Sequence, residues 1–364
     1  MRMRDCEIRP FENCIRKVKY TNKIASQDFK PSGRFPIVSQ EEAFISGYWD
    51  NPEDVFHIDG PVVIFGDHSR HIKYVDFDFV IGADGVKILA PVEDIDTKYL
   101  YYYLKSQPIQ SLGYSRHYKV LKEKYVPVLS LAEQQRIVVE LDLLSRVIEL
   151  KNAQIRTLDE LAQSIFYEMF GDPVSNEKVW DTLKMKVVAP QKGYSGNIPM
   201  HNGKQWLLNL DMVESQTGQI LEKVLLPPSE IGNSTTTFNE ENVLYSKLRP
   251  YLNKVVIPDE PGYCTSELVP LLPDKEKLNR VFLAYLLRSK FFVEYINTRV
   301  AGAKMPRVSM SDFRDFDVIL PHYTLQESFA GRMLSIENQK RIIKNSMLAA
   351  KDLLASRMDK YFNE

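Results

Sequence analysis

Cysteine is scarce in this chain. The 364 residues include only Cys6, Cys14 and Cys264, and none of them has the C-x-x-C or C-x-x-H spacing typical of zinc sites. An odd number of widely scattered cysteines also argues against a disulfide framework and is typical of a reducing compartment. We therefore predict a protein without disulfide bonds and without a structural zinc ion.

Long apolar runs are absent as well. No stretch approaches the 18 or so uncharged apolar residues that a membrane-spanning helix needs. The basic first residues, MRMRDCEIRPFENCIRK, are not followed by the apolar core of a secretory signal. Together these absences predict a cytoplasmic protein that does not associate with membranes.

Sequence motifs of common enzymes are missing. The chain lacks G-x-G-x-x-G with a spaced acid, G-x-x-x-x-G-K-[ST], H-E-x-x-H and G-x-S-x-G. His68 and His71 form a local pair in the stretch HSRH, but no acidic or cysteine partner stands at ligand spacing, which favours a polar loop over a metal site. We predict a chain that is not an enzyme, with no catalytic residues, no cofactor and no metal.

Neither sign of charge is in excess. Lys and Arg number 47 and Asp and Glu 48, for a formal net charge of −1, so any basic surface must be local. Hydrophobic residues make up 44%, enough for real cores, and the length exceeds that of one ordinary domain. These values predict two or three folded domains.

What the sequence does contain is a repeated helical pattern. Residues 126–170 align without a gap on residues 318–362, 192 positions later. In each copy, apolar residues recur at alternating spacings of four and three over more than four heptads, and one lysine, Lys151 or Lys340, interrupts the seam. The two seams are Ile137, Leu141, Leu144, Ile148, Lys151, Ile155, Leu158, Ala162, Ile165 and Met169, then Phe329, Met333, Ile336, Lys340, Ile343, Met347, Ala350, Leu354, Arg357 and Tyr361.

Each seam predicts a helix of roughly 33 residues, about 50 Å long, that needs a partner helix. We expect the two copies to pair as an antiparallel coiled coil, because this lets the intervening residues fold at one end and the first domain at the other. The alternative is that each helix packs only on its own domain. Gly171 and Pro173 predict the end of the first helix, and Pro321 is compatible with the start of the second.

The helices divide the remainder into two similar blocks. Each has β-branched runs broken by glycines, such as GPVVIFGD and ENVLYSKLRPYL, followed by a short helical stretch at 99–106 or 282–289. Nine extra residues after the second stretch predict a longer connecting loop there. The fold class is therefore α+β: two mixed α/β domains separated by two long helices that form an antiparallel coiled coil. The predicted boundaries are 1–128, 129–173, 174–320 and 321–364.

Positive charge collects at equivalent places in both blocks. Residues 98–125 hold six basic residues and one acid, and residues 288–314 hold six basic residues and two acids. Local clusters in a near-neutral protein are typical of contacts with phosphates, and Arg and Lys in turn-prone loops also suit guanine edges. Each loop alone also fits a solvated basic turn. The candidate DNA-contacting residues are Tyr114, Arg116, His117, Tyr118, Lys119, Lys192, Tyr194, Lys247, Arg249, Lys304 and Arg307.

Segments along nearly the whole chain resemble the specificity subunit of Type I restriction-modification systems. They are RFPIVSQ at 34–40, GADGVKILAP at 82–91, PVLSLAEQQRIVVELD at 127–142, FYEMFGDP at 166–173 and YSKLRPYL at 245–252. The resemblance implies two target-recognition domains, each of which reads one half of a bipartite asymmetric DNA target, while the helices set the spacing. It also adds Ser246 to the candidate residues, because Ser246, Lys247 and Arg249 match a strand–loop segment of the recognition domain.

The resemblance further implies what the chain does and with what. It would be the DNA sequence-recognition subunit, binding double-stranded DNA and recruiting modification subunits that methylate adenine with S-adenosylmethionine. A restriction subunit, an ATP-dependent endonuclease and translocase, would be a further partner. The alternative is a coiled-coil scaffold that binds protein partners without sequence-specific DNA recognition. A third possibility, a nuclease or transferase fused in one chain, is disfavoured by the missing motifs.

Overall fold

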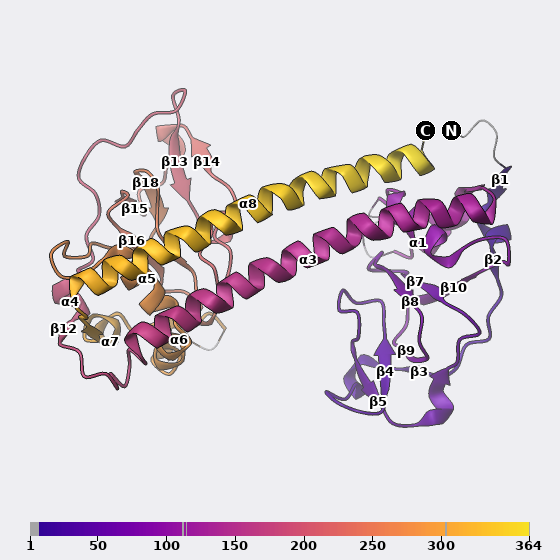
Figure 1. The fold of residues 1–364 in the computed structure, drawn as a ribbon, viewed down its shortest axis with the longest axis horizontal. Helices are drawn as coiled ribbons and strands as arrows, with labels where there is room; N and C mark the ends of the chain where they lie inside the picture. Colours follow the sequence, from indigo (N-terminus) through magenta and orange to yellow (C-terminus); the bar gives the residue numbers. More distant parts are fainter. Residues whose placement is uncertain (1–6, 111–112, 114, 303, 364) are drawn as a thin grey trace. The chain divides into compact units, whose positions relative to one another are not determined.

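Two long helices are the largest elements of the chain. In the computed structural model, which describes residues 7–110, 113, 115–302 and 304–363, α3 spans Leu131–Phe170 and α8 spans Tyr323–Phe362 (Figure 1). Each has 40 residues, more than the roughly 33 expected, because each begins six residues before its first seam position. Gly171, at φ +75°, ends α3 as predicted, and its N–H donates to the Tyr167 carbonyl over 2.8 Å.

The predicted seams are confirmed. All twenty seam positions are buried or half-buried, whereas apolar residues beside them, such as Val139 and Leu143, are mostly exposed. Of the two interrupting lysines, Lys340 is buried and Lys151 is half-buried. Burial that follows the 3.5-residue repeat is what a helix–helix seam requires.

The chain divides into two compact units, and each unit contains one part of α3 and one part of α8. Unit 1 comprises Met1–Asn152 and Asn345–Glu364, and unit 2 comprises Ala153–Lys344. In unit 1 the last turns of α8 contact the first half of α3, with Arg357 Nε 3.0 Å from Glu140 Oε1. In unit 2 the first half of α8 contacts the second half of α3, with Lys340 Nζ 2.7 Å from Asp159 Oδ1. The helices are therefore antiparallel, as predicted.

Unit 1 contains two β-sheets and a separate pair of strands. The sheets have the strand orders β2-β10-β7-β8 and β3-β9-β4-β5, β6 also pairs with β9, and β1 pairs with β11. The strands are β1 (Glu7–Pro10), β2 (Ile15–Arg16), β3 (Lys23–Ile24), β4 (Phe35–Val38), β5 (Gly47–Trp49), β6 (Val55–Phe56), β7 (Val62–Gly66), β8 (Ile72–Val75), β9 (Phe79–Gly82), β10 (Val86–Pro91) and β11 (Tyr125–Val128), with helices α1 (Thr97–Ser106) and α2 (Tyr118–Lys122).

Unit 2 repeats this plan. Its sheets have the orders β17-β16-β19 and β14-β13-β18-β15, with the strand pairs β12-β22 and β20-β21. The elements are β12 (Thr182–Lys184), α4 (Met185–Val188), β13 (Gln205–Leu208), β14 (Val224–Leu226), β15 (Thr235–Phe238), β16 (Val243–Ser246), β17 (Val255–Val256), β18 (Gly262–Thr265), β19 (Leu268–Leu271), α5 (Arg280–Arg288), α6 (Lys290–Asn297), β20 (Val300–Ala301), β21 (Arg307–Val308), α7 (Met310–Arg314) and β22 (Asp317–Ile319).

The two domains share the same arrangement of their main strands. In unit 1, β7 is the central strand between antiparallel β10 and β8, and in unit 2, β16 holds the same place between β19 and β17. Each domain also contains one parallel pair in its other sheet, β4 with β9 and β13 with β18. The internal repeat therefore extends through the globular blocks, where sequence identity alone did not establish it.

The expected helices after these sheets are present, and one expectation was wrong. α1 and α5 cover the stretches 99–106 and 282–289, and their N-caps Asp96 and Asn279 each accept hydrogen bonds from two backbone amides. The nine extra residues of the second block do not form only a longer loop, because most of them form α6. Phe292 and Ile296 of α6 are buried in the unit 2 core, which explains why the insertion is helical.

Aromatic residues at the helix ends complete both cores. Phe170, the last residue of α3, packs on Phe282 of α5 with ring centroids 4.7 Å apart. Phe362, 192 positions later, packs on Tyr99 of α1 at 5.2 Å. The last residue of α3, the helix that follows the first domain in the sequence, thus packs in the core of unit 2. The last residue of α8, which follows the second domain, packs in the core of unit 1. None of the helices in the described part of the chain is long and apolar enough to cross a membrane.

Candidate nucleic-acid interface

In unit 2, two segments that the sequence singled out separately lie together. The Val308 amide donates to the Lys247 carbonyl over 2.8 Å, and the Arg249 amide donates to the Pro306 carbonyl over 2.7 Å. These bonds join the turn after β16 to the loop that precedes α7. Lys247, Arg249, Lys304 and Arg307, four predicted residues, therefore belong to one basic surface.

An acid orders part of this surface. Arg307 donates from Nη2 to Glu267 Oε1 over 3.0 Å, and Nε lies 3.4 Å from the other carboxylate oxygen. This contact with Glu267 raises the pKa of Arg307 above its ordinary value. Arg307 and Lys304 are exposed, whereas Lys247 and Arg249 are half-buried. Because Glu267 holds the Arg307 guanidinium in place, Arg307 could present an oriented fork of donors to a ligand.

Two of the predicted contacts are not at the surface. Ser246 is 3% exposed and its hydroxyl donates to the Leu248 carbonyl over 2.9 Å, so it shapes the turn instead of facing solvent. His117 is 1% exposed, and both its backbone amide and its Nδ1 lie within 2.9 Å of the Asp67 carbonyl oxygen. These two side chains are therefore buried within unit 2 and unit 1, and direct contact of either with DNA stays a prediction.

The remaining unit 1 candidates divide between packing and exposure. Tyr118 is half-buried, its ring lies 6.4 Å from those of Phe11 and Phe65, and burial raises its pKa. Arg116 and Lys119 on either side of it are exposed. Tyr114 lies outside the described residues. Among the described residues of this loop, the exposed charged side chains are therefore cationic.

Lys192 and Tyr194 lie along other strands of unit 2. The Lys192 amide donates to the Pro270 carbonyl over 3.0 Å, beside β19, and the Tyr194 amide donates to the Thr237 carbonyl over 3.2 Å, beside β15. Lys192 is exposed and Tyr194 is half-buried. Neither residue forms part of the hydrogen-bonded junction between the β16 turn and the α7 loop, so they stay a separate prediction.

Sequence reasoning missed the turn after β7. It treated HSRH as an ordinary polar loop, but β7 is the structural equivalent of β16, so Asp67 follows β7 as Lys247 follows β16. Asp67 Oδ1 accepts the Tyr118 amide at 2.7 Å, which attaches this turn to the basic loop of unit 1. Arg70, within the turn, is exposed and donates from Nη1 to the Ile109 carbonyl over 3.0 Å. The repeat itself was the signal that could have identified it.

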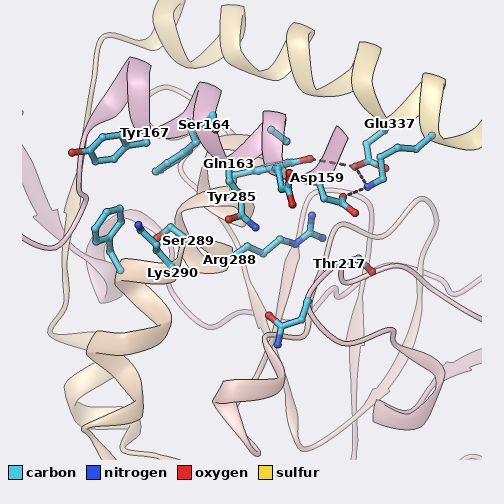
Figure 2. Close-up of a pocket in the computed structure, with 16 residues that line it drawn as sticks. Asp159, Gln163, Ser164, Tyr167, Thr217, Tyr285, Arg288, Ser289, Lys290 and Glu337 are labelled. Atoms are coloured by element: carbon cyan, nitrogen blue, oxygen red, sulfur yellow. Dashed lines mark hydrogen bonds and ion pairs between the residues drawn. The ribbon is translucent and has the colours of Figure 1, made fainter. Parts of the chain in front are cut away.

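A separate pocket in unit 2 lies between α3, α8 and the α5–α6 junction (Figure 2). It has a volume of about 710 Å³. Its polar groups bond to one another, since Lys340 Nζ contacts Asp159 and Glu337 at 2.7 and 2.9 Å and the Tyr285 hydroxyl donates to Glu337 over 3.3 Å. None of the described candidate DNA contacts lines this pocket, which belongs to the region where α3, α8 and the α5–α6 junction meet.

Comparisons with known proteins agree with this architecture. No protein-family model matches the chain. The EcoR124I/EcoR124II specificity subunit of Escherichia coli is 30% identical over 88 residues, which cover 23% of this chain and only 22% of that protein. The MjaVIII specificity subunit of Methanocaldococcus jannaschii is 24% identical over 370 residues, which cover 92% of this chain and 86% of that protein. Both relatives are subunits of Type I restriction enzymes.

Solved structures give the same result for the fold. The S subunit of a Type I restriction-modification system from M. genitalium has a TM-score of 0.60 and 14% identity, with 99% of this chain and 97% of that one covered. A chain from a structure of type I R-M complex assembly and conformational transition has a TM-score of 0.52 and 16% identity, with 97% and 96% covered. Along nearly its whole length the chain thus has the fold of Type I restriction-modification specificity subunits and matches them in sequence, which confirms the resemblance noted from its motifs.

Proposed function

We propose that this chain is the DNA sequence-recognition subunit of a Type I restriction-modification complex. The observation that carries the proposal is that the same construction occurs in both units. In each, the backbone carbonyl of the residue after the central strand accepts a hydrogen bond from a basic loop far along the sequence, Asp67 from the His117 amide and Lys247 from the Val308 amide, both over 2.8 Å. Basic turns held at equivalent places suit phosphate contacts that orient a domain while base contacts specify the sequence.

The two domains would read different half-sites. Their turns differ, with GDHSRH in one domain and SKLRPYL in the other, so the target would be bipartite and asymmetric. Arg116 and Lys119 in unit 1, and Lys247, Arg249, Lys304 and Arg307 in unit 2, would contact DNA. Tyr118 and Tyr194 would support these contacts, and Lys192 would add a peripheral one.

The chain would act with other subunits in the cytoplasm. Modification subunits would supply S-adenosylmethionine and methylate adenine, and a restriction subunit would hydrolyse ATP and cut double-stranded DNA. The chain itself would catalyse none of these steps, in keeping with the lack of catalytic motifs in its sequence. The likeness to specificity subunits over most of the chain favours this function over a protein-binding scaffold.

The test is to produce the chain with its modification subunit in a host and to map methylated adenines along the genome. We expect methylation within one motif made of two unlike half-sites separated by a fixed spacer. Omission of this chain serves as the control and should abolish the motif. Methylation that is absent, or whose motif does not depend on this chain, would contradict the proposal and leave the scaffold function.

A further inference from the structure

We propose that Arg70 and Arg249 each read a guanine, one in each half of the DNA target. The inference rests on the proposed function and assigns base recognition to two named side chains. Arg70 lies in the turn between β7 and β8, and Arg249 lies in the equivalent turn between β16 and β17. Both turns are joined to the basic loop of their own unit.

Both arginines hold a backbone conformation that favours glycine. Arg70 has a φ of +66° and Arg249 has a φ of +50°. Eight non-glycine residues among those described have positive φ, and these two are the only charged ones. The left-handed region costs an ordinary residue roughly 1–2 kcal/mol. Glycine would remove this cost, so an arginine with this backbone conformation in both turns points to a role of the side chain.

The turn of Arg249 is further constrained. Arg249 directly precedes Pro250, which restricts the backbone of Arg249. The hydrogen bond from the Arg249 amide to the Pro306 carbonyl also fixes the turn against the loop before α7. Its Nε is buried and has no hydrogen-bond partner among the described residues, and the same holds for Oδ1 of Asn253, which also has a φ of +50°. Orphaned polar atoms and strained backbone are thus concentrated in one five-residue turn. Such a concentration is expected where a ligand completes the bonding.

Gln40 stabilises the turn of Arg70 by two hydrogen bonds. The His68 amide donates to Gln40 Oε1 over 3.1 Å, and the Ser69 hydroxyl donates to the Gln40 carbonyl. The Gly66 amide closes the turn by donating to the His71 carbonyl over 2.9 Å. Arg70 is exposed at this fixed point, and only its Nη1 has a recorded partner, the Ile109 carbonyl. An exposed arginine is thus held on a turn that several hydrogen bonds fix in place.

Guanine is the base that this chemistry selects. It presents O6 and N7 as two acceptors in the major groove, and a guanidinium donates to both at once. A lysine or a phosphate contact needs no such fixed fork, so the exposed cations Arg116, Lys119 and Lys304 suit the DNA backbone instead. A rigid arginine beside flexible cations would separate base recognition from backbone contact in each domain.

The experiment uses the chain assembled with its modification subunit and compares methylation motifs of R70G, R249G, R70K and R249K. Glycine adopts positive φ freely, so the glycine variants remove the side chain without straining the turn. Asn202, at φ +51° in another turn of unit 2, provides the matched control N202G. Thermal unfolding of each complex confirms that the variants fold.

We expect R70G to lose the preference for guanine at one position of one half-site, and R249G at one position of the other. The ratio of methylation with guanine to that with other bases should fall about ten- to a hundredfold at that position. The lysine variants should keep the salt dependence of DNA binding but lose most of this preference, and N202G should change neither.

Three outcomes overturn the inference. The first is a wild-type motif that lacks guanine in one of its halves. The second is an unchanged motif in R70G or R249G, and the third is binding weakened equally for all sequences with a salt slope lower by about one, which marks a phosphate contact. A wild-type complex with no motif at all would instead contradict the proposed function, so the two failures are distinguishable.

Discussion

Gln134 and Gln326 make the same three hydrogen bonds in the two units. Each lies in the first turn of its long helix with no exposed surface. Gln134 donates to the carbonyls of Asp94 and Leu129 and accepts from the Asp96 amide, all over 2.8 Å. Gln326 donates to the carbonyls of Lys277 and Pro321 and accepts from the Asn279 amide, at 2.8 to 3.0 Å. One side chain thus fixes each long helix to the N-cap of its domain's helix.

Replacement of either glutamine by methionine, Q134M or Q326M, should destabilise its unit by about 2–4 kcal/mol. Methionine keeps the size of the side chain but removes the buried amide that is the hydrogen-bond partner of three backbone groups. Urea unfolding followed by circular dichroism measures the loss. Q135M is the control, because Gln135 is exposed and should change stability by less than about 0.5 kcal/mol. Equal effects of Q134M and Q135M would show that the buried bonds are unimportant.

Phe362 should matter for the domain at the opposite end of the sequence. F362A removes a buried ring from Tyr99 and Tyr103, with a cost of about 3–5 kcal/mol. Amide hydrogen exchange should therefore speed up in α1, whereas α5 should keep its protection. L353A, at an exposed position of α8, is the control. Unchanged exchange in α1 would contradict the packing of Phe362 described above.

The long helices could be predicted because their periodicity is local. Ten seam positions in each copy repeat every 3.5 residues, and any three of them already define a face. The choice of Phe362 as the residue that closes the core around Tyr99 could not be predicted, because it depends on contacts between residues more than 250 positions apart. The same holds for α6, whose helical form depends on a core pocket for Phe292.

The candidate site was predicted in pieces. Charge was the reason to choose Lys247, Arg249, Lys304 and Arg307. The two segments that carry these residues lie together because of a long-range hydrogen bond between the Val308 amide and the Lys247 carbonyl. Ser246 was included because of the family resemblance and His117 because it lies in a basic loop, and neither argument considered burial. Backbone carbonyls satisfy both of them inside the fold, and no local pattern encodes such partners. Arg70 was missed because its stretch was compared only with a metal site and was then interpreted as an ordinary polar loop.

Lys340 should stabilise unit 2 in a pH-dependent way. Its side chain is 8% exposed, and burial lowers its pKa, but the bonds to Asp159 and Glu337 outweigh burial and raise the pKa above 10.5. A raised lysine pKa means that the contribution is fully present below pH about 10 and is lost as pH rises through the folded-state pKa. K340M should therefore cost about 1–2 kcal/mol at pH 8, since the acids are partly exposed.

Urea unfolding of wild type and K340M at pH 8 and pH 11 measures this difference. The difference in unfolding free energy should shrink at pH 11, while K351M, at an exposed position of α8, should match wild type at both values. A K340M effect that is equally large at both pH values would show that lost packing, and not charge, is responsible.

Lys304 should act through phosphates. Under the proposed function, K304A should weaken DNA binding by the assembled complex for every sequence alike. The slope of log affinity against log salt concentration should fall by about one, because one fewer counterion is released. K351A controls for a lost surface charge. A changed methylation motif in K304A, or an unchanged slope, would argue against a phosphate contact.

The position of Phe362 has a consequence for synthesis on the ribosome. Unit 1 begins at the start of the chain, yet its core around Tyr99 is closed only by a residue near position 362. Residues 1–152 must therefore wait, with apolar surface uncovered, until residue 362 has also been synthesised. Unit 2, whose residues lie in one continuous stretch, can close first. A prematurely terminated product would carry an unfinished first domain, which quality-control proteases could recognise before such a chain joined a complex.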